Sequence, residues 1–280
     1  MPVSKRYIAI YFCLTIPLAW IFWIPLILIK QGQWTLAFQL PDFVLSSLGA
    51  LSPLIAILII QKISRGKVTL KGIFRKARLR EWKAGWVLSS IFIFPGLHLL
   101  NTGTYYLVEM SAGNRIEHFP IFDPEVFTNL GWGIIAIIPV HFITSLVTSP
   151  IFEEPGWRGF AFENLQAYLP RDVASLITGS YWWLWHQGMN IAFDLQPSVY
   201  RYVSMLAHSF TIDALYTLSG GNLLAAIFAH GIMSTLNTLF FDIPEVWYLM
   251  VSPIIAVGLL RYLVYRKSQI NREAFVFGMR

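Results

Sequence analysis

The chain has few charged residues and one cysteine. Of its 280 residues, 13% are charged and 56% are hydrophobic. A typical soluble domain has about 25% charged residues, because charges cover its surface. The composition therefore excludes a soluble globular enzyme, and it equally excludes a disordered chain, a collagen and a coiled coil. The lone Cys13 excludes an internal disulfide framework and a cysteine-rich zinc site.

The hydrophobic residues gather in eight stretches, most of them near the 20 residues that cross about 30 Å of hydrocarbon. The stretches are 7–29, 43–61, 85–108, 130–152 (running on toward 169), 173–193, 202–218, 222–241 and 246–265. In lipid each segment must satisfy its own backbone polar groups, which favours helices. The sequence therefore predicts an all-α, polytopic membrane helix bundle with about eight transmembrane helices. Without a linker or a repeat, residues 1–280 are expected to form a single integral membrane domain.

Basic residues concentrate in the loop after the second stretch and in the C-terminal tail. That loop contains Lys62, Arg65, Lys67, Lys71, Arg75, Lys76, Arg78, Arg80 and Lys83, whereas the loop after the third stretch is acidic. Positive loops stay on the cytoplasmic side. We therefore expect a multi-pass protein with both termini cytoplasmic, and the absence of long loops favours a bacterial plasma membrane.

The same basic residues indicate which partners to expect. They flank spans, so anionic lipid at the inner surface is an expected partner and nucleic acid is not. Within this loop, residues 64–82 alternate apolar and basic side chains. This pattern fits a short amphipathic helix on the inner surface and a solvated basic loop equally well.

Ionisable residues inside spans are costly, so each is a functional candidate. The fourth stretch ends in Glu153, Glu154, Pro155 and, further on, Arg158. Adjacent helical residues point about 100° apart, and residues four apart meet on one face. The natural assignment pairs Arg158 with Glu154 and leaves Glu153 facing a cavity as a general base. The competing interpretation is an ion pair at a helix end, and Pro155 is expected to kink the span.

Two histidines lie in other spans. His230 has Ser234 and Asn237 at spacings that return to nearly the same helix face, so these residues could donate hydrogen bonds to a developing oxyanion. His186 follows Trp182 by one turn, and this tryptophan is expected to shape the pocket or fix the ring. A single intramembrane histidine is more often a packing residue, so the pair matters more than either alone.

These motifs resemble a known family. Glu-Glu-x-x-x-Arg at 153–158, aromatic-x-x-x-His at 182–186 and the late His230 are similar to the CAAX-protease and bacteriocin-processing family of intramembrane endopeptidases, which includes the type II CAAX prenyl proteases. The resemblance covers roughly 130–241, the expected peptidase core. It implies hydrolysis of a peptide bond near the cytoplasmic membrane face in a membrane-associated peptide or protein substrate.

The resemblance also assigns roles to residues. It implies that Glu153 and His186 activate a water and that His230 faces the oxyanion. The family's last motif usually reads His-x-x-x-Asn, but here Ser234 occupies the Asn position. Asn237 lies one turn further, about 5 Å along the helix axis.

Several alternatives stay open. Two histidines and a glutamate can bind zinc, so His186, His230 and Glu153 are the candidate metal ligands. No H-E-x-x-H helix occurs, no cofactor is firmly implied, and we favour a glutamate-activated water without a tightly bound metal. Ser234 keeps open a catalytically silent immunity or scaffold protein of the same fold. A proton-coupled transporter is a third hypothesis; its relay would use Glu153, His186, His208, Asp213 and His230.

Overall fold

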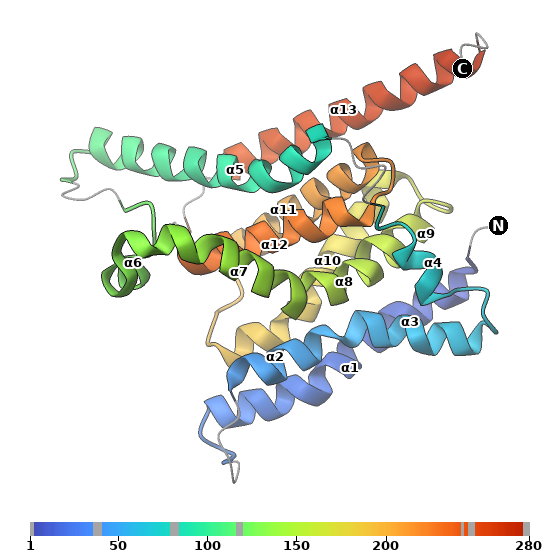
Figure 1. Ribbon diagram of the computed structural model, residues 1–280, viewed down its shortest axis with the longest axis horizontal. Coiled ribbons are helices and arrows are strands. Elements are labelled where there is room, and N and C mark those ends of the chain that lie inside the picture. The colour runs from blue at the N-terminus through green and yellow to red at the C-terminus, as the bar shows by residue number, and fades with distance from the viewer. Residues whose placement is uncertain are drawn as a thin grey trace.

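The computed structural model is a bundle of helices (Figure 1). It describes residues 3–35, 41–78, 84–115, 120–241, 244–245 and 250–276. Within these ranges the only extended pairing is a single bridge between Phe122 and Phe240. The prediction of an all-α membrane bundle is confirmed.

The described residues of the eight predicted spans lie mostly in helices, and several shorter helices join them; residues 246–249 of the last predicted span lie outside the described residues. The elements are α1 (Lys5–Lys30), α2 (Asp42–Ala50), α3 (Ser52–Ile63), α4 (Leu70–Phe74), α5 (Ala84–Ser111), α6 (Pro124–Leu130), a 3-10 turn (Gly131–Gly133), α7 (Ile134–Thr148), α8 (Pro150–Gly156), a π-helical turn (Trp157–Phe162), α9 (Glu163–Leu165), α10 (Arg171–Ala192), α11 (Val199–Leu218), α12 (Leu223–Leu239) and α13 (Val251–Val276).

Four of the described segments are long and apolar enough to cross a membrane by length and composition. They are Lys5–Lys30, Asp42–Ile63, Gly85–Ser111 and Pro124–Thr148. The outer helices also expose large apolar side chains, such as Phe92 on α5, Ile143 on α7 and Leu259 on α13. Such side chains suit contact with lipid, so the fold is that of an integral membrane protein.

Two of the predicted spans are interrupted, which corrects the sequence prediction. The second divides at Leu51 into α2 and α3, and the fourth divides at Ser149 into α7 and α8. Ser149 has φ −143° and ψ −70°, outside the helical region, and Pro150 follows it at the start of α8. Proline suits a helix start because it lacks the N–H that a first turn leaves unpaired.

The fourth span continues past Pro155, as the sequence predicted. Pro155 lies inside α8, and the chain passes into the π-helical turn Trp157–Phe162 before α9. Proline removes a backbone donor, and a π-helical turn is a common way for a helix to absorb such a change of register. Arg158 therefore lies within a continuous helical segment and not at a helix end.

The basic segment forms less helix than the amphipathic interpretation predicted. Among the described residues of this segment only α4 is helical, and it is started by Thr69, whose hydroxyl accepts from the Gly72 N–H. After α4, Lys76 donates to the Gly159 carbonyl and pairs with Glu163, which holds this segment against the end of the π-helical turn. Residues 79–82 of the predicted helix lie outside the described residues.

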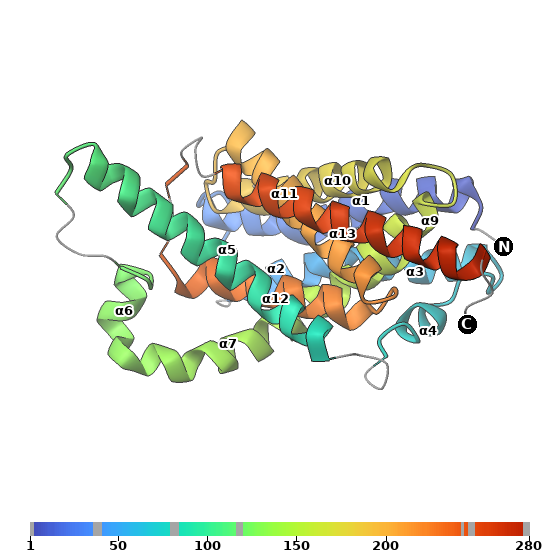
Figure 2. The same ribbon diagram turned by 90° about the horizontal axis from the view of Figure 1, so that it is seen from above.

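The helices form three layers. In Figure 1, α1, α2 and α3 lie at the bottom, α5 and α13 at the top, and α7, α8, α10, α11 and α12 between them. Figure 2 shows the top layer from above, with α5 and α13 crossing over the others. The contacts agree, because α5 packs on α12 and α13 packs on α11. This arrangement places α8 in the interior.

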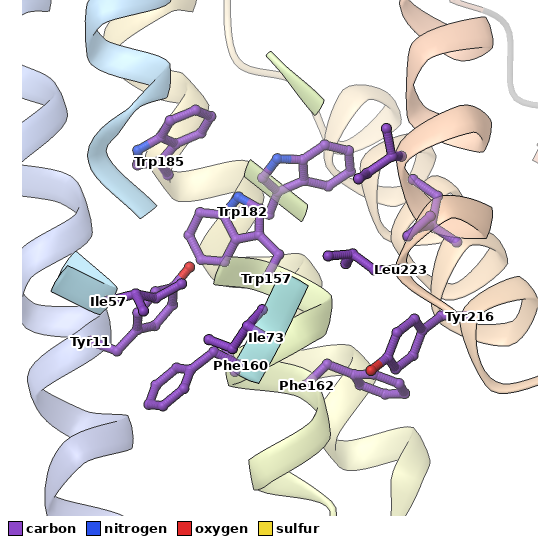
Figure 3. Packing of buried hydrophobic residues seen from close by; sticks show 14 of the residues in the cluster. Tyr11, Ile57, Ile73, Trp157, Phe160, Phe162, Trp182, Trp185, Tyr216 and Leu223 are labelled. Atoms are coloured by element: carbon purple, nitrogen blue, oxygen red, sulfur yellow. The ribbon is translucent and has the colours of Figure 1, made fainter. Parts of the chain in front are cut away.

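The core around α8 is aromatic (Figure 3). The Trp157 ring lies edge-on to Tyr11 of α1 at 5.6 Å and to Trp185 of α10 at 5.8 Å. Gly156 permits the close approach: a Cβ there would lie 2.3 Å from the Tyr11 hydroxyl and 2.6 Å from Pro53 Cβ. Backbone packing at this glycine fixes the position of the adjacent acidic pair.

Candidate active site

Glu153 lies in the interior of the bundle, with 2% of its surface exposed. The Ser149 hydroxyl donates to Oε1 at 2.6 Å, and the Trp182 indole Nε1–H donates to Oε2 at 2.9 Å. Each carboxylate oxygen thus has one donor and keeps a further lone pair. The interpretation of Glu153 as an interfacial residue facing bulk water is therefore wrong.

Arg158 binds two carboxylates on different helices. Its Nη1 donates to Glu154 Oε1 at 2.9 Å, which is the pairing expected from their spacing, and its Nε donates to Asp213 Oδ1 at 3.0 Å. Its Nη2 donates to the Ser209 hydroxyl at 2.8 Å. The guanidinium also lies over the Trp182 ring, 4.9 Å from the ring centroid. Since Arg158 and its partners are buried, these charges are compensated only by one another.

His230 joins this network through Glu154. The Nδ1 atom of His230 lies 2.8 Å from Glu154 Oε1. A carboxylate in an ion pair with arginine accepts hydrogen bonds, so Nδ1 carries the hydrogen and Nε2 is left for another group. Glu154 and Arg158 therefore fix both the tautomer and the orientation of this imidazole.

His186 also carries its hydrogen on Nδ1, but a backbone carbonyl fixes this tautomer instead of a carboxylate. Its Nδ1 lies 2.8 Å from the Trp182 carbonyl, which can only accept, so Nε2 carries the lone pair. Trp182 lies between the two histidines, with its ring edge-on to each at a centroid distance of 5.1 Å. Trp182 therefore contacts Glu153, His186 and His230 together.

The two candidate donors near His230 have different environments. The Ser234 hydroxyl donates to the His230 carbonyl at 3.1 Å, within its own helix. Asn237 is exposed and does not enter the buried network. The structure therefore brings Glu153, Glu154, Arg158, His186 and His230 together, keeps Ser234 on the same helix, and leaves Asn237 outside.

The structure adds three residues that the motifs did not include. Ser149 holds Glu153, Ser209 holds Arg158, and Asp213 is the second carboxylate on Arg158. Spacing carried a signal for two of them, since Ser149 lies four residues before Glu153 and Ser209 four before Asp213. The pairing of Asp213 with Arg158 joins positions 55 residues apart, so only the packing of α11 against the π-helical turn reveals it.

Zinc binding by His186, His230 and Glu153 stays a prediction. Among the residues that the structure describes, no three His, Cys, Asp or Glu side chains are placed to hold a metal ion. Glu154 and the Trp182 carbonyl occupy only the Nδ1 atoms of His230 and His186, so Nε2 of both rings stays open. We derive no step through a metal.

The arrangement provides the groups that hydrolysis of an acyl bond needs. A buried carboxylate can take a proton from water, and an imidazole Nε2 can orient that water or donate to an oxyanion. All three groups are held by other side chains or backbone groups, so they are positioned before a substrate binds. This chemistry agrees with what comparison with known proteins finds.

Residues 135–236 match the family model described as type II CAAX prenyl endopeptidase, Rce1-like. The family resemblance is confirmed over this segment. It contains Ser149, Arg158, Trp182 and His230, whereas Asn237 lies just outside it. The chain is also 32% identical over 94 residues to CAAX prenyl protease 2 of Methanococcus maripaludis. That alignment covers 34% of this chain and 30% of the relative, so the chain matches less than a third of the relative's length.

Proposed function

We propose that this protein is an intramembrane endopeptidase that cleaves its substrate with a water activated by Glu153 and His186. The observation that carries the proposal is the position of Trp182. Its N–H holds the buried Glu153 carboxylate and its ring contacts both His186 and His230. The match of residues 135–236 to an endopeptidase family supports the same activity.

The geometry suggests an order of proton transfers. Glu153 takes a proton from water, the water oxygen attacks the peptide carbonyl, and Glu153 then gives the proton to the leaving nitrogen. His186 orients the water through its Nε2 lone pair. To donate from Nε2 to the oxyanion while Nδ1–H binds Glu154, His230 must be cationic. The Glu154 carboxylate, 2.8 Å from Nδ1, stabilises that cation.

The proposed substrate is a membrane-associated peptide or protein. The relative's name specifies a CAAX prenyl protease, and this chain is 32% identical to it over 94 residues. We further propose a bacterial plasma membrane with both termini cytoplasmic and anionic lipid around the basic inner loops. In that orientation α9 and the start of α10 lie at the inner surface, so the scissile bond is reached from the cytoplasmic side.

A cleavage assay in proteoliposomes tests the proposal. Purified protein is incubated with a set of membrane-anchored, fluorophore-quencher peptides that include prenylated and unprenylated C-termini. Wild type should cleave at least one peptide, and Glu153→Gln and His230→Ala should abolish cleavage with unchanged circular dichroism. Glu125→Gln removes an exposed carboxylate and should cleave at the wild-type rate. Full activity of Glu153→Gln would refute the role of this residue as the base.

A catalytically silent protein is the second candidate, and Ser234 is the observation that favours it. The Ser234 hydroxyl hydrogen is donated to the His230 carbonyl, so it does not serve an oxyanion unless it rotates. If wild type is silent and Ser234→Asn cleaves the peptides, the silent interpretation is correct. Substrate-dependent proton flux into the same vesicles without cleavage would instead support a transporter.

A further inference from the structure

A second hollow, partly open to the surface, adjoins the site on the side of α13. A cavity of about 520 Å³ lies between α10, α11 and α13. This volume is typical of cavities that bind small ligands. Its walls are mostly apolar and aromatic, with Phe210 of α11 and Tyr262 and Tyr265 of α13 among them. Because α13 begins after residue 236, this cavity is only partly built from the segment that matches the endopeptidase family.

Asp213 lines the cavity with an unused carboxylate oxygen. Oδ1 accepts from Arg158, whereas Oδ2 is buried and has no partner at hydrogen-bond distance in the described part of the chain, and the nearby Ser175 hydroxyl also stabilises this carboxylate. The Asp213 side chain is 2% exposed. A buried carboxylate oxygen without a partner is costly, since its lost hydration is not replaced. The cavity is therefore expected to receive a hydrogen-bond donor.

The charges around Asp213 indicate that this donor is a cation. Arg158 is one guanidinium shared by Glu154 and Asp213, so while His230 is neutral this buried cluster has one more negative charge than positive charge. A positive group in the cavity would offset this excess where the dielectric constant is low. The tyrosine and phenylalanine rings of the walls also attract cations.

The outer part of the cavity contains positively charged side chains. Arg171 lines it at the start of α10, and an Asp172–Arg261 ion pair bridges α10 and α13 beside it. A ligand with an inner cation and an outer anion would match both ends. Ser175 lines the wall beside Asp213 and adds a hydroxyl that can accept from the same cation.

We propose that the cavity between α10, α11 and α13 binds a primary ammonium group that donates to Asp213 Oδ2. Two sources present this chemistry: the headgroup of an aminophospholipid, whose phosphate would lie toward Arg171, and a soluble alkylamine. The site is distinct from the water-activating groups and its test needs no peptidase activity. Ligand binding there acts on Arg158 through a shared carboxylate, and so on Glu154 and His230.

Native mass spectrometry of the full chain tests the site. Protein is delipidated in detergent and offered equal amounts of phosphatidylethanolamine and phosphatidylglycerol. Wild type should retain the ethanolamine lipid preferentially. Hexylamine should displace that adduct, whereas hexanol, of the same length without the charge, should not. If hexylamine stabilises the protein against heat but no ethanolamine lipid adduct forms, the site is supported and its source is a soluble amine.

Two variants locate the binding. Asp213→Asn keeps the oxygen that accepts from Arg158 and replaces Oδ2 by a donor, so ammonium binding should fall about tenfold or more. Gly258→Phe fills the cavity from α13, where a Cβ meets nothing within 4 Å, and should give a similar loss without touching Arg158. Phosphatidylglycerol adducts and helical circular dichroism should not change. Equal ethanolamine binding and equal stabilisation by hexylamine in wild type and both variants would overturn the proposal.

Discussion

Trp182 connects the acidic pair to the two histidines. In the sequence its position, one turn before His186, indicated a packing residue. In the structure the ring does pack, but the indole N–H also binds Glu153 and the ring face receives the Arg158 guanidinium. A phenylalanine at this position could keep the packing but could not donate. The indole hydrogen bond therefore holds Glu153 against α10. Mutagenesis can separate this hydrogen bond from the packing of the ring.

Trp182→Phe should lower the peptidase rate about ten- to a hundredfold, because a hydrogen bond to a charged group contributes roughly 1.5–3 kcal/mol. The measurement is kcat in the proteoliposome assay, with thermal unfolding recorded alongside. Trp183→Phe is the matched control, since the buried Trp183 Nε1–H has no hydrogen-bond partner among the described residues. It should retain the wild-type rate. Equal losses in the two variants would show that ring volume matters and the Glu153 hydrogen bond does not.

Arg158 is expected to stabilise the folded protein as well as to support the active site. Arg158→Lys keeps the charge but cannot form the three-way fork to Glu154, Asp213 and Ser209. Leaving a buried carboxylate without its partner costs about 3–5 kcal/mol, so the variant should unfold at clearly lower denaturant or temperature.

Tryptophan fluorescence during thermal and detergent-induced unfolding measures this loss. Arg201→Lys provides the comparison, because the Arg201–Glu245 pair is partly exposed and such pairs contribute about 1 kcal/mol or less. If Arg158→Lys were as stable as Arg201→Lys, the hydrogen bonds of Arg158 in the core would not contribute the expected stability.

At the scale of elements, α8 is too short to be stable by itself, and its position depends on close contacts with neighbouring helices. It spans seven residues between the break at Ser149 and the π-helical turn. Gly156→Ala would place a methyl group 2.3 Å from the Tyr11 hydroxyl and 2.6 Å from Pro53 Cβ, so α1 or α3 must move. We expect a destabilisation of about 1–3 kcal/mol, as for other overpacked cores, and a reduced rate as Glu153 shifts.

The control for this change is Gly96→Ala within α5. A Cβ at Gly96 meets nothing within 4 Å, so alanine should be neutral or stabilise the helix by about 0.5–1 kcal/mol. Melting temperatures of both variants, measured in one detergent, provide the comparison. An unchanged melting temperature for Gly156→Ala would mean that α8 tolerates movement against α1 and α3.

These elements also show what the sequence could predict. Length and hydropathy were sufficient to predict helices at the apolar stretches, four of which are long and apolar enough to cross a membrane, because membrane-spanning helices are constrained strongly by lipid. The Glu154–Arg158 pair followed from helical periodicity. The breaks at Leu51 and Ser149 were not predicted, since both lie in apolar runs and hydropathy carries no signal for where one helix ends and the next begins. Asp213 was also missed as the partner of Arg158, because its distance from Arg158 depends on how α11 packs.

At the scale of the whole molecule, the segment that matches the endopeptidase family lies between two other layers. Layers α1 to α3 and α5 with α13 enclose it (Figure 1). The lower layer contributes Tyr11 and Pro53 to the packing around α8, and α13 closes the ammonium cavity. The proposed function of both sites depends on which face of the bundle meets the cytoplasm.

Cysteine labelling tests that orientation. The single cysteine permits a clean design: Cys13→Ala removes it, and one cysteine is then introduced at Lys67, in the basic loop, or at Asn114, in the acidic loop. Both side chains are exposed. Because basic loops remain inside, a membrane-impermeant maleimide should label the Asn114→Cys protein in intact cells and the Lys67→Cys protein only after permeabilisation.

The labelling result bears on both proposals at once. If Lys67→Cys were labelled in intact cells, α9 and the start of α10 would face outward. The scissile bond would then be reached from outside, and the ammonium cavity would open to the outer leaflet, where anionic lipid is scarcer. Inward orientation keeps the basic loop, the proposed peptidase site and the cavity rim with Arg171 on the same side, at the lipid surface whose negative potential attracts the basic loop and Arg171.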